Sequence, residues 1–545
     1  MIQPRRAACA EPRARRRFAK FAGALGATLM ATTGLVALAA DVPNAGASTA
    51  SGPTFTWAFN SSPRSLFGPT DYDSTMMNIM TLIYGTELVY SNSGKLEPEI
   101  VTSWKAVNPT TYVYHVRPGV KFSNGAPVTA ADVAYSLNLQ LTKKLASEEV
   151  ALFAAVKSIT AKGDTVTVRL SSPTSFWQYV PATIAGYVYD PASVKKDLTG
   201  YGSPSAIPVG AGPYMVSKDV PNSEVTLVRN PHYYGKPGRY AKIVFDIIPD
   251  QSTMLLALEQ GTIDGTSDLT TPLVTLRKDA TVKLVPELAW FGLTLDMQEK
   301  PFNTLHVREA LYLATNRTAI LGPKDDRTGT LSVTVNTPSI FYGVLPKREV
   351  KRSYAKIKTL PYNPTAAKKQ LAQSKYPKGF TVTLNVPETA TSIVKTAEIV
   401  QAEWAQIGVT LHLKLMPGGP RFQVILNHGP TLGVQIIGNL PTGPDPVQMA
   451  YEYFSRAQAA KGGNNSSNYK NAKVNKLLDE ANSSTTAVKA AKLTLQAQVL
   501  ASKAAPIIPF SFGDYVLAVH KGWKIGQLGT FFDSTVNWVT AFRAP

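Results

Sequence analysis

TYVYHVRPGVKFSNGAPVTAADVAYS, residues 111–136, is the stretch of sequence that decides the fold. Its first part alternates apolar and polar side chains, which predicts a half-buried β-strand over 110–117. Gly119 suits the turn that follows, because glycine adopts backbone angles that other residues avoid. Thr129 is a natural N-cap and predicts a helix over 130–141. The sequence therefore predicts a strand, a turn and a helix in close succession.

The rest of the chain continues this alternation of strand-like and helix-like segments. Strands are expected at 55–59, 165–170, 243–248, 381–386 and 409–415, and helices at 252–260, 306–321 and 396–407. The Gly/Asn/Ser-rich stretch 462–468 is expected to be a surface loop. Regular alternation of this kind is typical of α/β architecture and predicts largely parallel sheets.

Composition places the chain among ordinary globular proteins. It has 545 residues, of which 44% are hydrophobic and 17% charged, a length that suggests about two to four domain-sized units. The net charge is +19, and the basic residues are scattered in ones and twos. A nucleic-acid site would need a clustered basic stripe, so we expect a solvated basic surface and no nucleic-acid partner. Attraction to an anionic membrane surface or an acidic partner stays open.

The N-terminus has the pattern of an export signal. Residues 13–20 are basic, residues 21–40 are apolar, and small residues follow. This order predicts a signal peptide at 1–40 and a flexible leader at 41–52, with a retained membrane anchor as the alternative. Residues 15–20, RRRFAK, resemble the twin-arginine motif R-R-x-F-x-K, although basic clusters also occur in other export signals.

Motifs of known catalytic and metal sites are missing from the sequence. The six histidines are dispersed, and the single cysteine, Cys9, lies in the basic N-terminal stretch. Neither residue type forms a zinc pattern or a disulfide framework. The sequence also lacks the nucleophile elbow, the phosphate-binding loop and the dinucleotide fingerprint. We therefore expect no enzyme activity, no cofactor and no metal.

The decisive stretch is one of several motifs that occur in a fixed order. The others are LEPEIVTSW at 96–104, VGAGPY at 209–214, LEQGTID at 258–264, a Pro-Phe/VREA/Asn-Arg pattern at 301–317 and a late motif at 469–478. Together they resemble extracellular solute-binding proteins of family 5, which serve dipeptide, oligopeptide and nickel importers. The resemblance extends over roughly residues 55–520, almost the whole chain after the predicted signal.

The resemblance implies the fold, an α/β two-lobed clamp of the type II periplasmic-binding-protein class with an extra subdomain in the first lobe. Transferred to this sequence, the first lobe uses 53–90, 205–292 and 505–545, its extra subdomain is 91–204, and the second lobe is 293–504.

The resemblance also implies the function, a substrate-binding receptor of an ABC importer. Such a receptor captures a small solute, for this family most often a peptide, and delivers it to a membrane permease and its ATPase. An exported monomer, periplasmic or on the cell surface, is expected. An oligosaccharide, an opine or a metal chelate are alternative solutes, and a secreted enzyme or a peptide chaperone on the same scaffold is an alternative function.

By position, the resemblance assigns several residues to the ligand cleft. Tyr72 and Asp73 fall where family members present an extended strip of backbone to the ligand. Trp290 and Phe291 precede the first crossing between the lobes, and Phe512 lies on the returning segment. For each aromatic residue, packing in the core is the alternative.

The sequence departs from the family pattern at residues 438–446, GNLPTGPDP. Peptide binders of the family often have G-W-x-x-D-x-x-D-P here, with a Trp that packs on the ligand and a first Asp that holds its ammonium group. Asn439 and Thr442 occupy those two positions, whereas Asp445 is kept. A hydroxyl cannot replace the charge-assisted bond, worth about 1.5–3 kcal/mol. Asp73 or Asp445 are the alternatives for this role.

Overall fold

The computed structural model describes residues 52–71, 74–91, 94–388, 390–429, 432–484, 486–530 and 537–545. The predicted signal peptide, the leader up to residue 51, Cys9, Tyr72 and Asp73 lie outside these ranges. Among the described residues, no helix combines the length and apolar character needed to cross a lipid bilayer.

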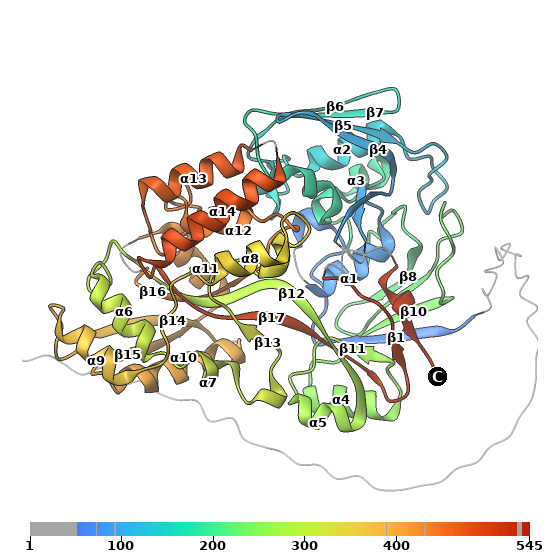
Figure 1. Ribbon diagram of the computed structural model, residues 1–545. Helices are drawn as coiled ribbons and strands as arrows, with labels where there is room; N and C mark the ends of the chain where they lie inside the picture. The colour runs from blue at the N-terminus through green and yellow to red at the C-terminus, as the bar shows by residue number, and fades with distance from the viewer. Residues whose placement is uncertain are drawn as a thin grey trace, which may run out of the picture. The chain divides into compact units, whose positions relative to one another are not determined.

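The decisive stretch forms the predicted strand and helix, β5 (Thr111–Val116) and α2 (Ala130–Leu139). A reciprocal capping box begins α2: the Thr129 hydroxyl accepts from the Asp132 N–H, and the Asp132 carboxylate accepts from the Thr129 N–H at 2.8 Å. β5 belongs to a four-stranded antiparallel sheet with the order β4-β5-β7-β6. Its other strands are β4 (Val101–Asn108), β6 (Val156–Lys162) and β7 (Thr165–Leu170). Figure 1 shows α2 beside this sheet.

A second, larger sheet has eleven strands. The order is β15-β14-β16-β12-β17-β11-β1-β10-β9-β8, with β13 paired to β17. Its strands are β1 (Thr54–Phe59), β8 (Tyr214–Val220), β9 (Glu224–Arg229), β10 (Lys242–Ile247), β11 (Gly265–Thr266), β12 (Ala280–Leu295), β13 (Gly329–Leu331), β14 (Thr381–Pro387), β15 (Thr410–Met416), β16 (Val434–Asn439) and β17 (Ile507–His520). The short strands β2 (Leu88–Tyr90), β3 (Leu96–Pro98), β18 (Lys524–Ile525) and β19 (Phe542–Arg543) form two separate pairs.

Two long strands, β12 and β17, connect the two halves of the large sheet (Figure 1). They pair with each other antiparallel along most of their length. The C-terminal part of β12, residues 290–295, also pairs with β16, whereas the C-terminal part of β17 pairs with β11. The fold is therefore an α/β clamp of two lobes joined by this strand pair. The lobe boundaries taken from the sequence stay a prediction.

The expectation of largely parallel sheets is wrong. Only β1 with β10 and β11, and β14 with β15 and β16, pair in parallel among the described strands of the large sheet. β8 and β9 are separated by three residues, 221–223, a connection too short for anything but an antiparallel hairpin. β12 and β17 pair antiparallel although they lie far apart in sequence, which local periodicity does not reveal.

The helices follow the apolar patterns of the sequence. They are α1 (Ser74–Ile83), α3 (Pro191–Lys196), α4 (Gln251–Gln260), α5 (Leu273–Asp279), α6 (Leu305–Ala314), α7 (Arg317–Leu321), α8 (Lys347–Tyr354), α9 (Pro364–Ala372), α10 (Thr391–Ala405), α11 (Gly418–Asn427), α12 (Gln448–Phe454), α13 (Ala472–Asn482) and α14 (Ala487–Ser502). α4 ends as predicted at Gly261, whose φ of 70° is left-handed.

The single helix predicted at 306–321 is divided into α6 and α7. Thr315 leaves the helical region with φ −95° and ψ 113°. Asn316 then caps α7 by accepting from the Ala319 N–H at 3.1 Å, and the Glu403 carboxylate accepts from the Asn316 N–H at 2.7 Å. Short polar side chains compete with helical hydrogen bonds in this way, which explains the break.

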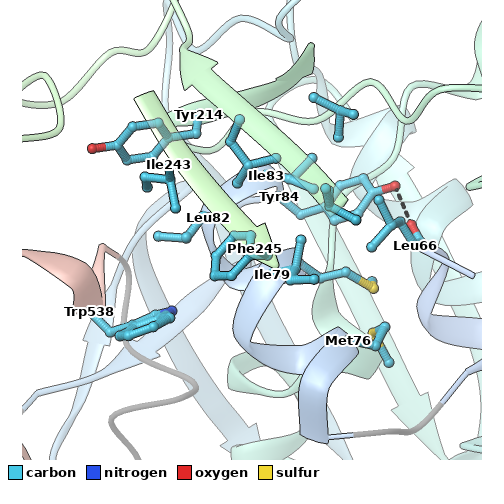
Figure 2. Close-up of a cluster of buried hydrophobic side chains, with 14 of the residues drawn as sticks. Leu66, Met76, Ile79, Leu82, Ile83, Tyr84, Tyr214, Ile243, Phe245 and Trp538 are labelled. Carbon is cyan, nitrogen blue, oxygen red and sulfur yellow. Dashed lines mark hydrogen bonds between the residues drawn. The ribbon is translucent and has the colours of Figure 1, made fainter. Parts of the chain in front are cut away.

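One hydrophobic core lies between α1 and the large sheet (Figure 2). Met76, Ile79 and Ile83 recur at helical spacing on α1 and are fully buried. They belong to one cluster with Ile243 and Phe245 of β10. Burial of each such side chain stabilises the fold by about 1.5–3 kcal/mol.

Residues 462–468 do not form the predicted surface loop. Asn465 is fully buried, and its amide donates to the backbone carbonyls of Ser455 and Tyr469 at 2.9 and 3.0 Å. Ser466 and Ser467 are buried as well. Polar composition misleads here because these hydrogen bonds offset the cost of burying polar atoms.

Candidate functional site

A cavity of about 720 Å³ lies between two parts of the chain that are distant in sequence. Residues 148–152 line one side, and α11, β16 and α12 contribute the other. The volume is within the range of about 300–1,000 Å³ that is typical of small-ligand sites.

Three of the predicted site residues line this cavity: Phe291, Asn439 and Thr442. Phe291 lies between the cavity and the hydrophobic core. Its ring is 5.6 Å from that of Phe510, in an edge-to-face arrangement. Asn439 is the last residue of β16, and Thr442 follows in the loop before α12. Their assignment as ligand contacts stays a prediction.

Trp290 and Phe512 lie in the hydrophobic core. Trp290 is 1% exposed and packs edge-to-face on Tyr453, with the ring centroids 4.9 Å apart. Phe512 is also buried and is the register partner of Trp290 between β12 and β17. Successive side chains of a strand point to opposite faces, which explains why Phe291 reaches the cavity and Trp290 does not.

A carboxylate that the sequence reasoning missed, Glu452 of α12, lines the same cavity. Three side-chain amides donate to it: Gln448 to Oε1 at 2.9 Å, and Asn464 and Asn439 to Oε2 at 3.1 and 3.2 Å. Burial raises the pKa of Glu452, whereas these three hydrogen bonds lower it. The polar side chains around Asn439 therefore form a hydrogen-bond network centred on the Glu452 carboxylate.

Thr442 is part of the same network through Gln448. The Gln448 amide donates to both the Thr442 hydroxyl and Glu452 at 2.9 Å, and its carbonyl accepts from the Thr442 N–H at 2.9 Å. Gln448 and Glu452 are four residues apart and share one helix face. That spacing, directly after the Asp-Pro motif, is a sequence signal that could have indicated Glu452, but it was not recognised.

Two further carboxylates, Glu148 and Glu149, line the other side of the cavity. Glu148 forms an ion pair with Arg64 at 3.0 Å. Glu149 is 7% exposed, and burial, followed by the nearby charge of Glu148, raises its pKa to about 7. Within the described ranges, neither Glu149 nor Glu452 has a cation within ion-pair distance.

Arg421 of α11 is the one basic side chain among the described residues that line the cavity. It is 9% exposed and donates to the backbone carbonyls of Asn385 and Ile436, so it links β14 to β16. Burial lowers its pKa. Three carboxylates and one guanidinium thus line this cavity, in a chain whose net charge is +19.

Asp445, the remaining predicted residue, lines a second cavity of about 500 Å³. Its carboxylate accepts from the Ser175 hydroxyl at 2.6 Å and from the Val447 N–H at 2.9 Å. The Ser175 hydroxyl also lies 3.2 Å from Oδ1 of Asn482. Burial raises the pKa of Asp445 to about 6. Asp445 therefore connects the loop before α12 to the segment around Ser175.

No three His, Cys, Asp or Glu side chains in the part of the chain covered by the structure come together as metal ligands.

Comparison with known proteins agrees with the motifs and the fold. Residues 95–461 match the family described as "Bacterial extracellular solute-binding proteins, family 5 Middle". Heme-binding protein A of Haemophilus influenzae is 25% identical over 82% of this chain and 84% of its own length. The nickel-binding periplasmic protein of Escherichia coli is 26% identical over 66% of this chain and 70% of its own length.

A solved structure shares the fold. The ABC transporter-associated periplasmic binding protein DppA from Helicobacter pylori, in complex with the peptide STSA, superposes with a TM-score of 0.75. The sequences are 23% identical, and the match covers 90% of this chain and 98% of that one. These relatives are binding proteins, not enzymes, and proteins of this family are periplasmic or extracellular. From its motifs, its two-lobed fold and this match over more than half its length, the chain belongs to family 5 of the bacterial extracellular solute-binding proteins.

Proposed function

We propose that this protein is the receptor of an ABC importer, which captures a small solute in the 720 Å³ cavity and delivers it to the membrane permease. The observation that carries the proposal is the composition of the cavity wall. Residues 148–152 line it from one part of the chain, and α11, β16 and α12 line it from another. A ligand that contacts both sides stabilises the arrangement in which they are close together.

The strand pair β12–β17 supplies the connection about which the lobes move. Closure over a ligand shifts the population toward the closed form, which the permease then recognises. Such a cycle needs binding energy that differs between open and closed forms, and it needs no covalent step. Phe291 lies on β12 and lines the cavity, so a bound solute contacts the connection directly.

A short peptide is the solute class that we favour, and the DppA fold in complex with a peptide supports it. The cavity combines apolar side chains such as Phe422, Ile425 and Ile437 with the polar network around Glu452. A ligand with both apolar and charged groups fits this wall. An opine, an oligosaccharide or a metal chelate is the second candidate, because Asn439 and Thr442 replace the residues expected for peptide recognition.

The remaining expectations from the sequence belong to this proposal. They are export through the twin-arginine route, action as a monomer with a permease and an ATPase, and the lobe boundaries at 205, 293 and 505.

A thermal-shift and calorimetric screen of the purified protein tests the function. The panel contains di- to pentapeptides, opines, oligosaccharides and metal chelates. One solute class should raise the melting temperature and bind with one site per chain, and Phe291→Ala should weaken that binding. Lys195→Ala, on α3, is the control because it lies outside the residues that line the cavity. Chemical conversion of the bound solute would contradict a receptor function.

A further inference from the structure

Glu149 and Glu452, which have no cation within ion-pair distance among the described residues, line one cavity from different parts of the chain. Glu149 precedes the 3₁₀ turn Val150–Phe153, and Glu452 lies on α12. The chain carries 56 Lys and Arg against 37 Asp and Glu, so carboxylates without a basic neighbour are unexpected. The lack of a basic side chain beside these two carboxylates therefore needs a physical explanation.

The hydrogen bonds of Glu452 fix its orientation and leave room for a ligand. A carboxylate offers about four acceptor positions. The amides of Asn439, Gln448 and Asn464 occupy three of them. Because neutral amides hold the carboxylate in place without cancelling the charge of its ionised form, about one acceptor position remains available for a cationic ligand group. Asn439 and Gln448 are thus positioning residues for Glu452.

Thr442 occupies the position of the Asp that peptide binders of the family often have, but it does not itself supply a negative charge. Its hydroxyl accepts from the Gln448 amide, and its N–H donates to the Gln448 carbonyl. This pair of bonds fixes the Gln448 side chain, which in turn donates to Glu452. The departures from the family pattern at Asn439 and Thr442 are therefore coupled to one carboxylate that lies later in the chain.

Burial of these carboxylates in a closed cleft is unfavourable without a counter-charge. An ionised group loses solvation when water is excluded, and a cation placed against a carboxylate repays that loss. Since the wall holds three carboxylates and one guanidinium, its field favours a positive ligand group.

We propose that Glu452 receives a positively charged group of the transported solute, with Glu149 adding negative charge from the other side of the cavity, so that the cleft selects ligands that carry an ammonium, amidinium or guanidinium group. The inference rests on the proposed receptor function and names the chemical class of its solute. It assigns the recognition of positive charge to Glu452, ten residues after Thr442.

Matched ligand pairs that differ in one charge test the inference. The pairs are alanyl-lysine with alanyl-(Nε-acetyl)lysine, alanyl-alanine with N-acetyl-alanyl-alanine, and benzamidine with benzamide. Binding to the wild type is measured by isothermal calorimetry at pH 8. In each pair, the member with the additional positive group is called the cationic member and the member without that group the neutral one. In at least one pair, the cationic member should bind about 10- to 100-fold more tightly than its partner.

Variants identify the residues responsible. Glu452→Gln should weaken the cationic ligand by about 10-fold or more and Glu149→Gln by a smaller factor, and both should leave the neutral ligand unchanged. Glu259→Gln, an exposed carboxylate on α4, removes the same charge and should change neither affinity. If Glu452→Gln does not fold, judged by circular dichroism and melting temperature, Glu149→Gln decides the test.

The outcomes separate the inference from the proposed function. Equal or tighter binding of the neutral members, or full affinity in both variants, would overturn the cation assignment and leave the receptor function intact. If the wild type binds no member of any pair, the cation assignment fails. If native mass spectrometry of the purified protein then also finds no retained solute and the broader panel gives no binding, the receptor function fails with it.

Discussion

Asp445 offers a quantitative test of how the structure sets stability. Its side chain is 2% exposed, and burial raises its pKa from 3.8 to about 6 in the folded protein. In the unfolded chain, the carboxyl group is solvated and ionises near its ordinary pKa. The folded protein therefore binds more protons than the unfolded chain between these two values, and stability falls as the pH rises through this window.

The size of the effect follows from the difference between the two pKa values. Each unit corresponds to about 1.36 kcal/mol, so ionisation of Asp445 costs about 3 kcal/mol of unfolding free energy above pH 7. The stabilising contribution is complete below pH 3.8 and is lost once the pH exceeds about 6. Asp445→Asn removes this titration.

The local hydrogen bonds can accommodate the amide. The Asn oxygen keeps the bond from the Val447 N–H, and the Ser175 hydroxyl reverses to accept from the new amide. Ser175 then has Asn482 Oδ1, 3.2 Å away, to which it can donate. The isosteric change thus keeps the bond from Val447 and gives one of the two new amide N–H groups an acceptor in Ser175.

Urea unfolding followed by tryptophan fluorescence at pH 4.5, 6 and 8 measures the effect. The variant should gain about 2 kcal/mol relative to the wild type between pH 4.5 and pH 8, since part of the full effect lies below pH 4.5. Other titrating groups cancel in this difference, because both proteins contain them. Glu259→Gln serves as a charge-matched control at an exposed site. A constant difference between wild type and Asp445→Asn at all three pH values would refute the reasoning.

Four further outcomes are expected. Glu87→Gln should reduce the loss of melting temperature between pH 6 and 9, because Glu87 is buried and burial raises its pKa well above 4.5; an unchanged pH profile would contradict this. Trp290→Ala should cost about 3–5 kcal/mol of unfolding free energy in urea titrations, with Phe291→Ala costing much less, since the first residue is buried and the second lies at the cavity. Gly379→Ala should lower the melting temperature, because φ is 94° and a Cβ would lie 1.8 Å from the Gly408 carbonyl oxygen, whereas Gly343→Ala, with open space around it, should not. Calorimetry should show weaker binding of a cationic solute as the pH falls from 8 to 5.5, because Glu149 has a pKa of about 7 and loses its charge across that range; Glu149→Gln should show a smaller change.

Local signals in the sequence were sufficient for much of the fold. Thr129 and Asp132 gave the start of α2, and Gly261 gave the end of α4, because capping and left-handed turns depend on a few neighbouring residues. The division of the predicted 306–321 helix depends on Glu403, which is distant in sequence and accepts from the Asn316 N–H. Such a contact has no local pattern.

The candidate site was predictable only in part. The motif at 438–446 directed attention to Asn439 and Thr442, which do line the cavity. Glu452 was missed because its significance depends on amides from β16, from α12 itself and from the loop at 464. Trp290 and Phe291 are adjacent in sequence and equally aromatic, so only the strand's position in the sheet distinguishes a core residue from a cavity residue.

Native mass spectrometry of freshly purified protein is the most direct test of the receptor function. A cavity of about 720 Å³ accommodates one small solute, so the spectrum should contain one non-covalent adduct of a few hundred daltons per chain. The released solute should be chemically intact, should rebind with one site per chain, and should rebind more weakly to Phe291→Ala. A bare chain mass together with no binding of any solute in the panel, or release of a chemically converted product, would contradict the account.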